Sequence, residues 1–255
     1  NMEFHNKSIQ ISQNLKKAYD QQYKAESGNW RKLGAEQKVK NILRIVEGRK
    51  YESVLEVGAG DGSILELLNH RSFANEFHGL EISESGVAKI REKNISRLKS
   101  IQLFDGYKLP FESQSIDLII LSHVLEHVEH ERILLREIKR VGKAAVIEVP
   151  KDYRFNADKK INHFLSYGHI NIYTPTSLKF LLLTENFKIV NSFSSLYSKA
   201  SFFVNSTNIF SKLKSLIIYG FKKILTSTPF EYINNKFVNT VTVLIEPIDK
   251  ETSIF

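Results

Sequence analysis

The 255-residue chain contains no cysteine, which excludes disulfides, thiolate zinc sites, cysteine nucleophiles and iron–sulfur clusters. Long apolar runs are also missing, because no stretch approaches the roughly 18 residues that a membrane span requires. Residues 1–20 are polar with scattered apolar side chains, unlike a signal peptide. We therefore expect a cytoplasmic protein. Hydrophobic types make up 42% of its residues, which is enough for one large core.

Negative charge is scarce in both flanks of the chain. The net charge is +8, with eleven Lys or Arg against five Asp or Glu in residues 1–50 and six against one in residues 193–236. A basic flank is often only a solvated surface, but it can also attract nucleic acid, an anionic membrane or an acidic substrate. The charge pattern leaves these alternatives open.

Strand-like and helix-like apolar patterns alternate along the middle of the chain. They predict helices at 8–24, 35–47, 62–70, 84–96, 129–141 and 175–185, a Gly-Asn-Trp break at 28–30, and strands at 52–57, 77–82, 100–104, 116–121, 144–149, 187–193 and 237–245. This alternation indicates an α/β fold, with a doubly wound, mostly parallel sheet and helices on both faces.

The first predicted strand runs into three glycines at alternate positions. Residues 54–62 read Val-Leu-Glu-Val-Gly-Ala-Gly-Asp-Gly, which places glycine at 58, 60 and 62. Without a Cβ the backbone can approach a ligand closely, and the helix that follows offers free N–H groups. Dinucleotide enzymes use G-x-G-x-x-G, whereas Ser63 stands here where the last of those glycines would fall. The loop predicts a cradle for another nucleotide-type cofactor.

Acidic residues close the next two predicted strands. Glu81 comes nineteen residues after Gly62, where a doubly wound fold places a carboxylate against a ribose. Asp105 and Gly106 end the third strand and precede a Leu-Pro-Phe stretch at 109–111. Both acids are therefore candidate cofactor ligands at the carboxyl edge of the sheet.

The E-x-G-x-G-x-G pattern that begins at Glu56, followed by Glu81 and Asp105, resembles the motifs of class I S-adenosylmethionine (SAM) dependent methyltransferases. The resemblance implies a Rossmann-like, seven-stranded, mostly parallel sheet of order 3-2-1-4-5-7-6, with N-terminal helices and an insertion before an antiparallel last strand. It implies SAM as cofactor, S-adenosyl-L-homocysteine as product, the ribose on Glu81 and the adenine near Asp105. The cofactor-binding residues implied are Glu56, Gly58, Ala59, Gly60, Gly62, Glu81, Ile82, Asp105, Gly106, Ser122 and His123, with Tyr19, Tyr23 and Trp30 as an aromatic cap.

Candidate catalytic residues follow the fourth predicted strand. Methyl transfer requires mainly alignment of the nucleophile, exclusion of water and sometimes removal of a proton. Residues 122–128 resemble the H-V-L-E-H-V segment of the small-molecule branch of the family. His123 and His127 are candidate catalytic residues in this segment. His169 is a third candidate catalytic residue and His163 a further candidate base; both fall between the fifth predicted strand and the following helix, and an imidazole titrates near neutrality.

The same segment raises the question of a metal. His123, Glu126 and His127 stand at i, i+3 and i+4, so they would share one helical face. The segment is similar to the E-x-x-E-H segment with which ubiquinone-pathway O-methyltransferases and small-RNA 2′-O-methyltransferases hold a divalent ion, where His169 could be the distant ligand. His123 replaces the first Glu here, and one carboxylate is poor provision for Mg²⁺, so we predict no metal.

We predict a single methyltransferase domain with four parts: a helical cap at 1–50, a SAM-binding core at 51–192, an insertion or lid at 193–236, and the last strand and tail at 237–255. Apolar residues at helical spacing within the insertion predict an amphipathic helix at 212–225. That helix could pack on its own domain, cap the substrate pocket, contact a second subunit or lie on a membrane surface.

The predicted function is SAM-dependent methyl transfer to a small-molecule acceptor, most simply at an oxygen, with an anionic acceptor favoured by the basic insertion. A nucleobase amine is disfavoured because the [DN]-P-P-[YF] motif is absent after the fourth strand, and without cysteine the covalent route to 5-methylcytosine is closed, so we expect no DNA partner. The alternatives are an RNA or glycan methyltransferase and a non-catalytic SAM-binding regulator. The sequence allows a monomer or a homodimer.

Overall fold

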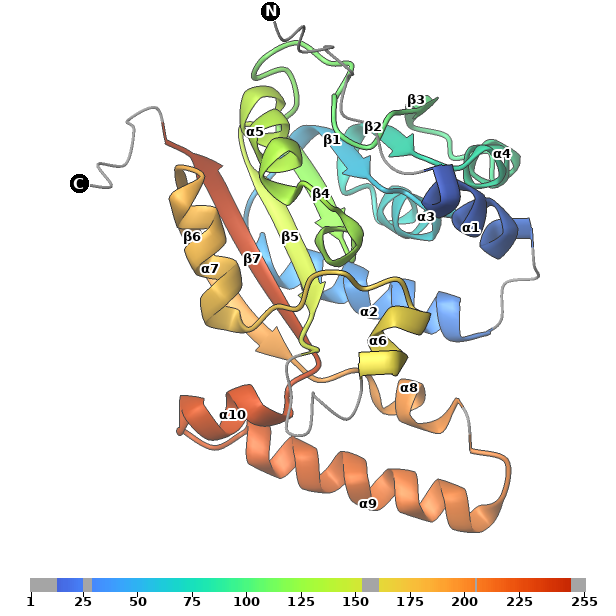
Figure 1. Cartoon of the computed structure of the whole chain (residues 1–255), viewed down its shortest axis with the longest axis vertical. Coiled ribbons are helices and arrows are strands. Elements are labelled where there is room, and N and C mark those ends of the chain that lie inside the picture. Colours follow the sequence, from blue (N-terminus) through green and yellow to red (C-terminus); the bar gives the residue numbers. More distant parts are fainter. Residues whose placement is uncertain (1–12, 25–28, 153–160, 205, 249–255) are drawn as a thin grey trace, which may run out of the picture.

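The computed structural model describes residues 13–24, 29–152, 161–204 and 206–248, and its centre is a seven-stranded sheet (Figure 1). The strand order is β3-β2-β1-β4-β5-β7-β6, as predicted. Every pairing is parallel except those of β7, which runs antiparallel to both β5 and β6. The strands are β1 Tyr51–Val57, β2 Ala74–Glu81, β3 Leu98–Leu103, β4 Leu118–Ser122, β5 Ala145–Pro150, β6 Phe187–Ser195 and β7 Thr240–Pro247.

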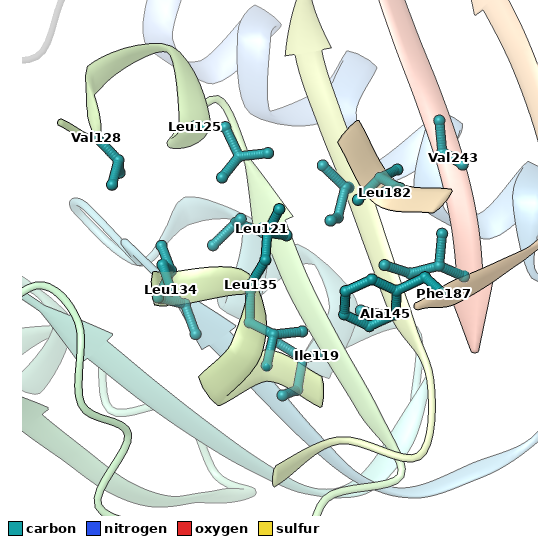
Figure 2. Packing of buried hydrophobic residues seen from close by; sticks show 14 of the residues in the cluster. Ile119, Leu121, Leu125, Val128, Leu134, Leu135, Ala145, Leu182, Phe187 and Val243 are labelled. Atoms are coloured by element: carbon teal, nitrogen blue, oxygen red, sulfur yellow. The ribbon is translucent and has the colours of Figure 1, made fainter. Parts of the chain in front are cut away.

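Helices cover both faces of this sheet, because its central strands are apolar on both sides. All residues of β4 and β5 are buried, as expected for parallel strands between two helical layers. One core cluster joins the sheet to α5 (Glu131–Val141) and α7 (Pro175–Thr184), and Figure 2 shows Leu135 and Leu182 packed in it near Phe187. The second cluster joins the other face to α2 (Asn29–Ile45), α3 (Ser63–His70) and α4 (Glu84–Glu92).

Some predicted boundaries are wrong for local reasons. The helix expected at 35–47 begins at Asn29, so the predicted break at 28–30 falls partly inside α2. The helix expected at 84–96 ends at Glu92, because Asn94 adopts a positive φ of 49°. The last strand begins at Thr240 because residues 231–237 form a helix. Of the helix predicted at 8–24, α1 covers Gln13–Lys24, and residues 8–12 lie outside the described residues.

Three helices lie between β6 and β7, at the carboxyl edge of the sheet: α8 (Lys199–Phe203), α9 (Ile209–Thr226) and α10 (Glu231–Phe237). The predicted helix at 212–225 corresponds to α9, and Asn208 fixes its start by accepting the N–H of Ser211 in a capping box. The short helices η1 (Leu125–His127), α6 (Ile161–Ser166), α8 and α10 were not predicted. In the described part of the chain, no helix combines the length and the apolar character needed to cross a membrane.

Candidate active site

The glycine loop after β1 has a backbone that suits glycine. Gly58, Gly60 and Gly62 have φ values of 75°, 60° and 75°, in the left-handed region where a side chain is strained. Space is also tight, because a Cβ at Gly58 would lie 2.6 Å from a methyl carbon of Val124. Backbone conformation and packing against Val124 therefore both favour glycine at position 58, and the role of the loop as a cofactor cradle stays a prediction.

Glu81 lies where β2 ends and fastens this loop. Its buried carboxylate accepts the Gly60 N–H at 2.8 Å and the Ser83 N–H at 3.0 Å. Burial raises the pKa of Glu81 above its ordinary value, although both N–H groups act in the opposite direction. Each carboxylate oxygen can accept a second hydrogen bond, so the loop contacts leave capacity for a ribose hydroxyl.

Asp105 stabilises the turn after β3. Its Oδ1 accepts the N–H groups of Tyr107 and Lys108, both at 2.8 Å. Gly106 lines the cavity described below, whereas Asp105 is not among the lining residues. The adenine contact of Asp105 thus stays a prediction.

Glu56 lies buried beneath the glycine loop. Burial raises its pKa well above the ordinary value, and its Oε2 has no hydrogen-bond partner within the described residues. Ala59 and Gly60 in the loop are also buried. Its carboxylate is hydrogen-bonded to the backbone of Leu65 in α3, and its predicted contact with the cofactor stays a prediction.

A cavity of about 490 Å³, part of it open to solvent, lies beside the loop. Its lining residues are Tyr19, Gly58, Glu81, Ile82, Phe104, Gly106, His123, Val124, His127 and Val128. They come from α1, the glycine loop, the ends of β2 and β4 and the turn after β3. Ligands bind at this carboxyl edge in open α/β sheets.

Of the predicted aromatic cap, the structure brings Tyr19 to the cavity. The ring of Tyr19 stands edge-on to His127, with centroids 5.8 Å apart, and burial raises the pKa of its hydroxyl. Trp30 is 54% exposed, contacts the guanidinium of Arg31 and does not line the cavity. The side chain of Tyr23 lies outside the described residues.

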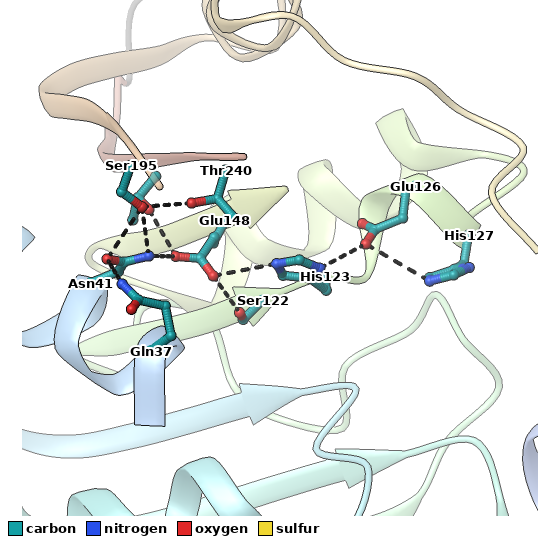
Figure 3. A network of polar contacts seen from close by, with 10 residues as sticks. Gln37, Asn41, Ser122, His123, Glu126, His127, Glu148, Ser195 and Thr240 are labelled. Atoms are coloured by element: carbon teal, nitrogen blue, oxygen red, sulfur yellow. Dashed lines mark hydrogen bonds and ion pairs between the residues drawn. The ribbon is translucent and has the colours of Figure 1, made fainter. Parts of the chain in front are cut away.

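His123 connects two buried carboxylates. It has a left-handed φ of 59°, and its backbone N–H donates to the carbonyl of Glu148 at 2.8 Å. Its ring places Nδ1 3.4 Å from Glu126 and Nε2 3.4 Å from Glu148, as Figure 3 shows. His123 therefore lines the cavity with its ring held between two acids.

Glu148, which the sequence analysis missed, is the anchor of this network. Its carboxylate accepts from Asn41 of α2 at 2.7 Å and from Thr242 of β7 at 2.8 Å (Figure 3 shows the Asn41 contact). Burial acts to raise its pKa, but the contacts with His123 and Asn41 outweigh burial and leave the pKa below its ordinary value. Glu148 is thus a buried, ionised carboxylate that holds His123 in place.

Glu126 and His127 belong to η1. The Glu126 side chain is 1% exposed, and neither carboxylate oxygen has a hydrogen-bond partner among the described residues. The Nδ1 of His127 lies 3.0 Å from the Gly168 carbonyl, which requires a proton on Nδ1 and leaves Nε2 as an acceptor. Burial lowers the pKa of His127, which favours the neutral ring.

His169 lies against His127, with ring centroids 4.9 Å apart. Its Nδ1 is hydrogen-bonded to the buried carboxylate of Asp152, just beyond β5. Burial acts to lower the pKa of His169, but the hydrogen bond and charge of Asp152 outweigh it and raise the pKa. The sequence analysis missed Asp152, although it follows a strand at the carboxyl edge just as Asp105 does.

The remaining predicted residues take different positions. Ile82 lines the cavity, and the buried hydroxyl of Ser122 donates to Glu148 at 3.5 Å. His163 lies exposed on α6, with its ring against Tyr167. The structure therefore brings together His123, His127 and His169 but leaves His163 at the surface.

Glu126, His127 and His169 each offer a ligand atom, and these atoms lie within 4.8 Å of one another. Two imidazoles and one carboxylate suit a transition metal better than Mg²⁺. His123, the position that corresponds to a ligand in the metal-binding methyltransferases, is not part of this group. The three residues could hold a cation, or they could handle the proton of an acceptor.

Comparison with known proteins agrees with the predicted fold and class of enzyme. The methyltransferase domain family matches residues 55–146. The chain is 26% identical over 194 residues to a demethylmenaquinone methyltransferase of Thermotoga maritima, covering 65% of this chain and 82% of that one.

Solved structures share the architecture at low identity. A methyltransferase of Haloferax volcanii, solved with the Trm112 methyltransferase activator, has a TM-score of 0.64 and 15% identity over 90% of this chain and 98% of its own. A SAM-dependent methyltransferase of Archaeoglobus fulgidus has a TM-score of 0.57 and 18% identity over the same shares. Residues 55–146 thus correspond to a methyltransferase domain, and the protein is a SAM-dependent methyltransferase with SAM as its cofactor.

Proposed function

We propose that the protein methylates an oxygen of a small-molecule acceptor and that His169, held by Asp152, takes the acceptor proton. One observation carries the proposal: His127 and His169 both have Nδ1 at an oxygen acceptor, so that Nε2 is the ring nitrogen left for an acceptor hydroxyl, and both rings belong to a cluster with the buried carboxylate of Glu126. Groups so oriented can accept a proton from a hydroxyl. The name of the Thermotoga relative supports a small-molecule acceptor.

The chain's own residues have distinct tasks in this reaction. When bound, SAM supplies an activated methyl group. His169 would remove the acceptor proton at Nε2 while Asp152 stabilises the resulting imidazolium, and neutral His127 would orient the acceptor hydroxyl from the cavity wall. Glu148 and His123 stay fixed, which keeps the end of β4 rigid beneath the acceptor.

Release of S-adenosylhomocysteine tests the proposal, measured across phenols, sugars, carboxylic acids, glycans and short RNAs. We expect turnover with a small hydroxyl-bearing acceptor. His169→Gln should lower kcat by about 10²–10⁴-fold, as expected when a general base is lost. His70→Gln, an identical change at an exposed imidazole at the end of α3, should leave kcat unchanged. Methylation of RNA or glycan alone, or SAM binding without turnover on any acceptor, would contradict the proposal.

A chelator separates the proton-transfer role from a metal role. Under this proposal, prolonged EDTA treatment followed by desalting leaves turnover unchanged. If EDTA abolishes turnover and Mn²⁺ or Zn²⁺ restores it, then Glu126, His127 and His169 are metal ligands instead.

A further inference from the structure

The helix α9 turns its apolar side toward solvent. Its exposed large apolar residues are Ile209, Phe210, Leu213, Leu216, Ile217, Ile218, Phe221 and Ile224, with exposed fractions between 39% and 81%. In the described chain, no residue of α9 is buried. A surface helix ordinarily shows the reverse arrangement, with its apolar stripe against the core.

The polar side of α9 faces the protein. Ser215 hydrogen-bonds to Ser206 at 3.0 Å, and the ring of Tyr219 packs on Phe202 of α8, with centroids 5.3 Å apart. The Lys222 ammonium lies 5.5 Å from the same ring. Because these positions recur every three to four residues, they define one helical face, and the apolar stripe is opposite to it. At the edge of the stripe, the ring of Phe221 also contacts Phe237 of α10, with centroids 6.2 Å apart, and is still 59% exposed. Figure 1 shows α9 on the outside of the molecule, below α8 and α10.

Lysines border this apolar stripe. On a helical projection at 3.6 residues per turn, Lys212 and Lys223 lie along one margin and Lys214 along the other, and all three are exposed. Residues 193–230 contain five lysines and no Asp or Glu. Lysines at the margins of an apolar stripe can lay their alkyl stems on it and hold the ammonium groups at the level of lipid headgroups.

From this arrangement we propose that the outward face of α9 docks on an anionic lipid bilayer, with its axis in the plane of the interface. The apolar residues enter the boundary of the acyl chains, and the lysines meet the anionic headgroups. A second copy of this chain fits the face less well, since a symmetric contact would bring two lysine-bordered stripes together with no acid in either segment.

Docking has a consequence for the candidate active site. The Lys151 N–H, just beyond β5, donates to the Asn239 carbonyl at 2.8 Å, which ties the segment between α10 and β7 to the carboxyl edge of the sheet. The cavity opens at this edge. A docked α9 would therefore hold that edge near the bilayer surface. An amphiphilic acceptor could then reach the cavity from the bilayer. This route for the acceptor rests on the proposed function, whereas the docking of α9 on the bilayer is independent of it.

Vesicle flotation of the full chain tests the docking. The probes are phosphatidylcholine vesicles with and without about 30% phosphatidylglycerol. We expect the protein to float with the anionic vesicles, and the triple variant Phe210→Ser, Ile217→Ser, Phe221→Ser to bind at least about tenfold more weakly because it loses the inserted side chains. A matched control changes Leu103, Phe180 and Leu183, which are comparably exposed on β3 and α7, to Ser and should float like the parent.

Two further measurements make the outcome decisive. SAM affinity should be equal in the parent and all variants, which shows that the SAM-binding core is folded and separates this test from that of the proposed function. Equal helical signal in far-ultraviolet circular dichroism should show that α9 stays folded in each variant. Phe210→Trp in a Trp30→Phe background should show blue-shifted emission on anionic vesicles, because its indole leaves water. A parent that stays with neither vesicle, or triple-variant binding equal to the parent's, overturns the proposal. The proposal is also overturned if the parent is a dimer that binds no vesicles and the triple variant is a monomer.

Discussion

At the scale of single residues, the glycine loop gives the sharpest prediction. Gly60→Val should abolish SAM binding, because a branched side chain at φ 60° would strain the backbone and occupy the cofactor's space. Gly48→Val is the matched control: Gly48 has a φ of 78° with no other atom within 4 Å of an added Cβ. It should cost similar backbone strain and leave SAM affinity unchanged in calorimetry. Equal affinities for both variants would remove the loop from the cofactor site.

Glu81 should contribute to SAM affinity through its charge. Glu81→Gln keeps the shape of the side chain but loses a charge-assisted acceptor for the Gly60 N–H and for the ribose, at a cost of about 1–3 kcal/mol in binding. Glu76→Gln, an identical change on the same strand away from the cavity, should leave the affinity unchanged. An unchanged affinity in the Glu81 variant would contradict the ribose assignment.

The pair of His169 and Asp152 should make stability depend on pH in a defined direction. Asp152 raises the folded-state pKa of His169 above its ordinary value of 6.5, despite burial. The pair therefore stabilises the fold fully below about pH 6.5, and this stabilisation is lost as the pH rises through the raised pKa.

Urea titrations of the parent and His169→Gln measure this effect. The difference in unfolding free energy should be larger at pH 5.5 than at pH 9, because the stabilisation by Asp152 requires the protonated imidazole. A difference that is constant or grows with pH would show that Asp152 does not hold a protonated imidazole.

At the scale of elements, the insertion can be separated from cofactor binding. None of the lining residues identified for the cavity belongs to α8, α9 or α10. Replacing residues 196–234 with a short Gly-Ser linker should therefore leave SAM affinity within a few-fold of the parent. A lid role for the insertion remains our prediction. It would be supported if this variant lost turnover on a soluble acceptor. If the variant kept its turnover, the insertion would be no lid, and membrane docking would be its one proposed role. A large loss of SAM affinity would contradict the separation.

The elements differ in how far the sequence predicts them. The order of β1 to β7 follows from local apolar patterns and the family motif, and α9 follows from its helical period. The orientation of α9 does not follow from the sequence, because the helical period of its apolar residues shows that a stripe exists but not what the stripe faces. The contacts of Ser215, Tyr219 and Lys222 with the rest of the insertion, together with the exposed fractions of the apolar residues, show that the stripe of α9 faces solvent.

Across the whole molecule, the residues of the candidate site are likewise predictable from the sequence where they are local features, and not where they depend on contacts between distant segments. Its glycines and Glu81 are predictable because the loop and the strand end are local features. The contact of His123 with Glu148 depends on the alignment of β4 with β5, and Asn41 joins Glu148 from 107 residues away. Asp152 could have been found by applying to the fifth strand the rule that selected Glu81 and Asp105.

Calorimetric titration of the full chain with SAM tests the central claim, which is that the loop at Gly58–Gly62 and the acid at Glu81 form a SAM site rather than a dinucleotide site. We expect one equivalent of SAM to bind in competition with S-adenosylhomocysteine, and NADH at the same concentration to give no heat. Binding of NADH in preference to SAM, or no binding of either SAM or S-adenosylhomocysteine, would contradict it.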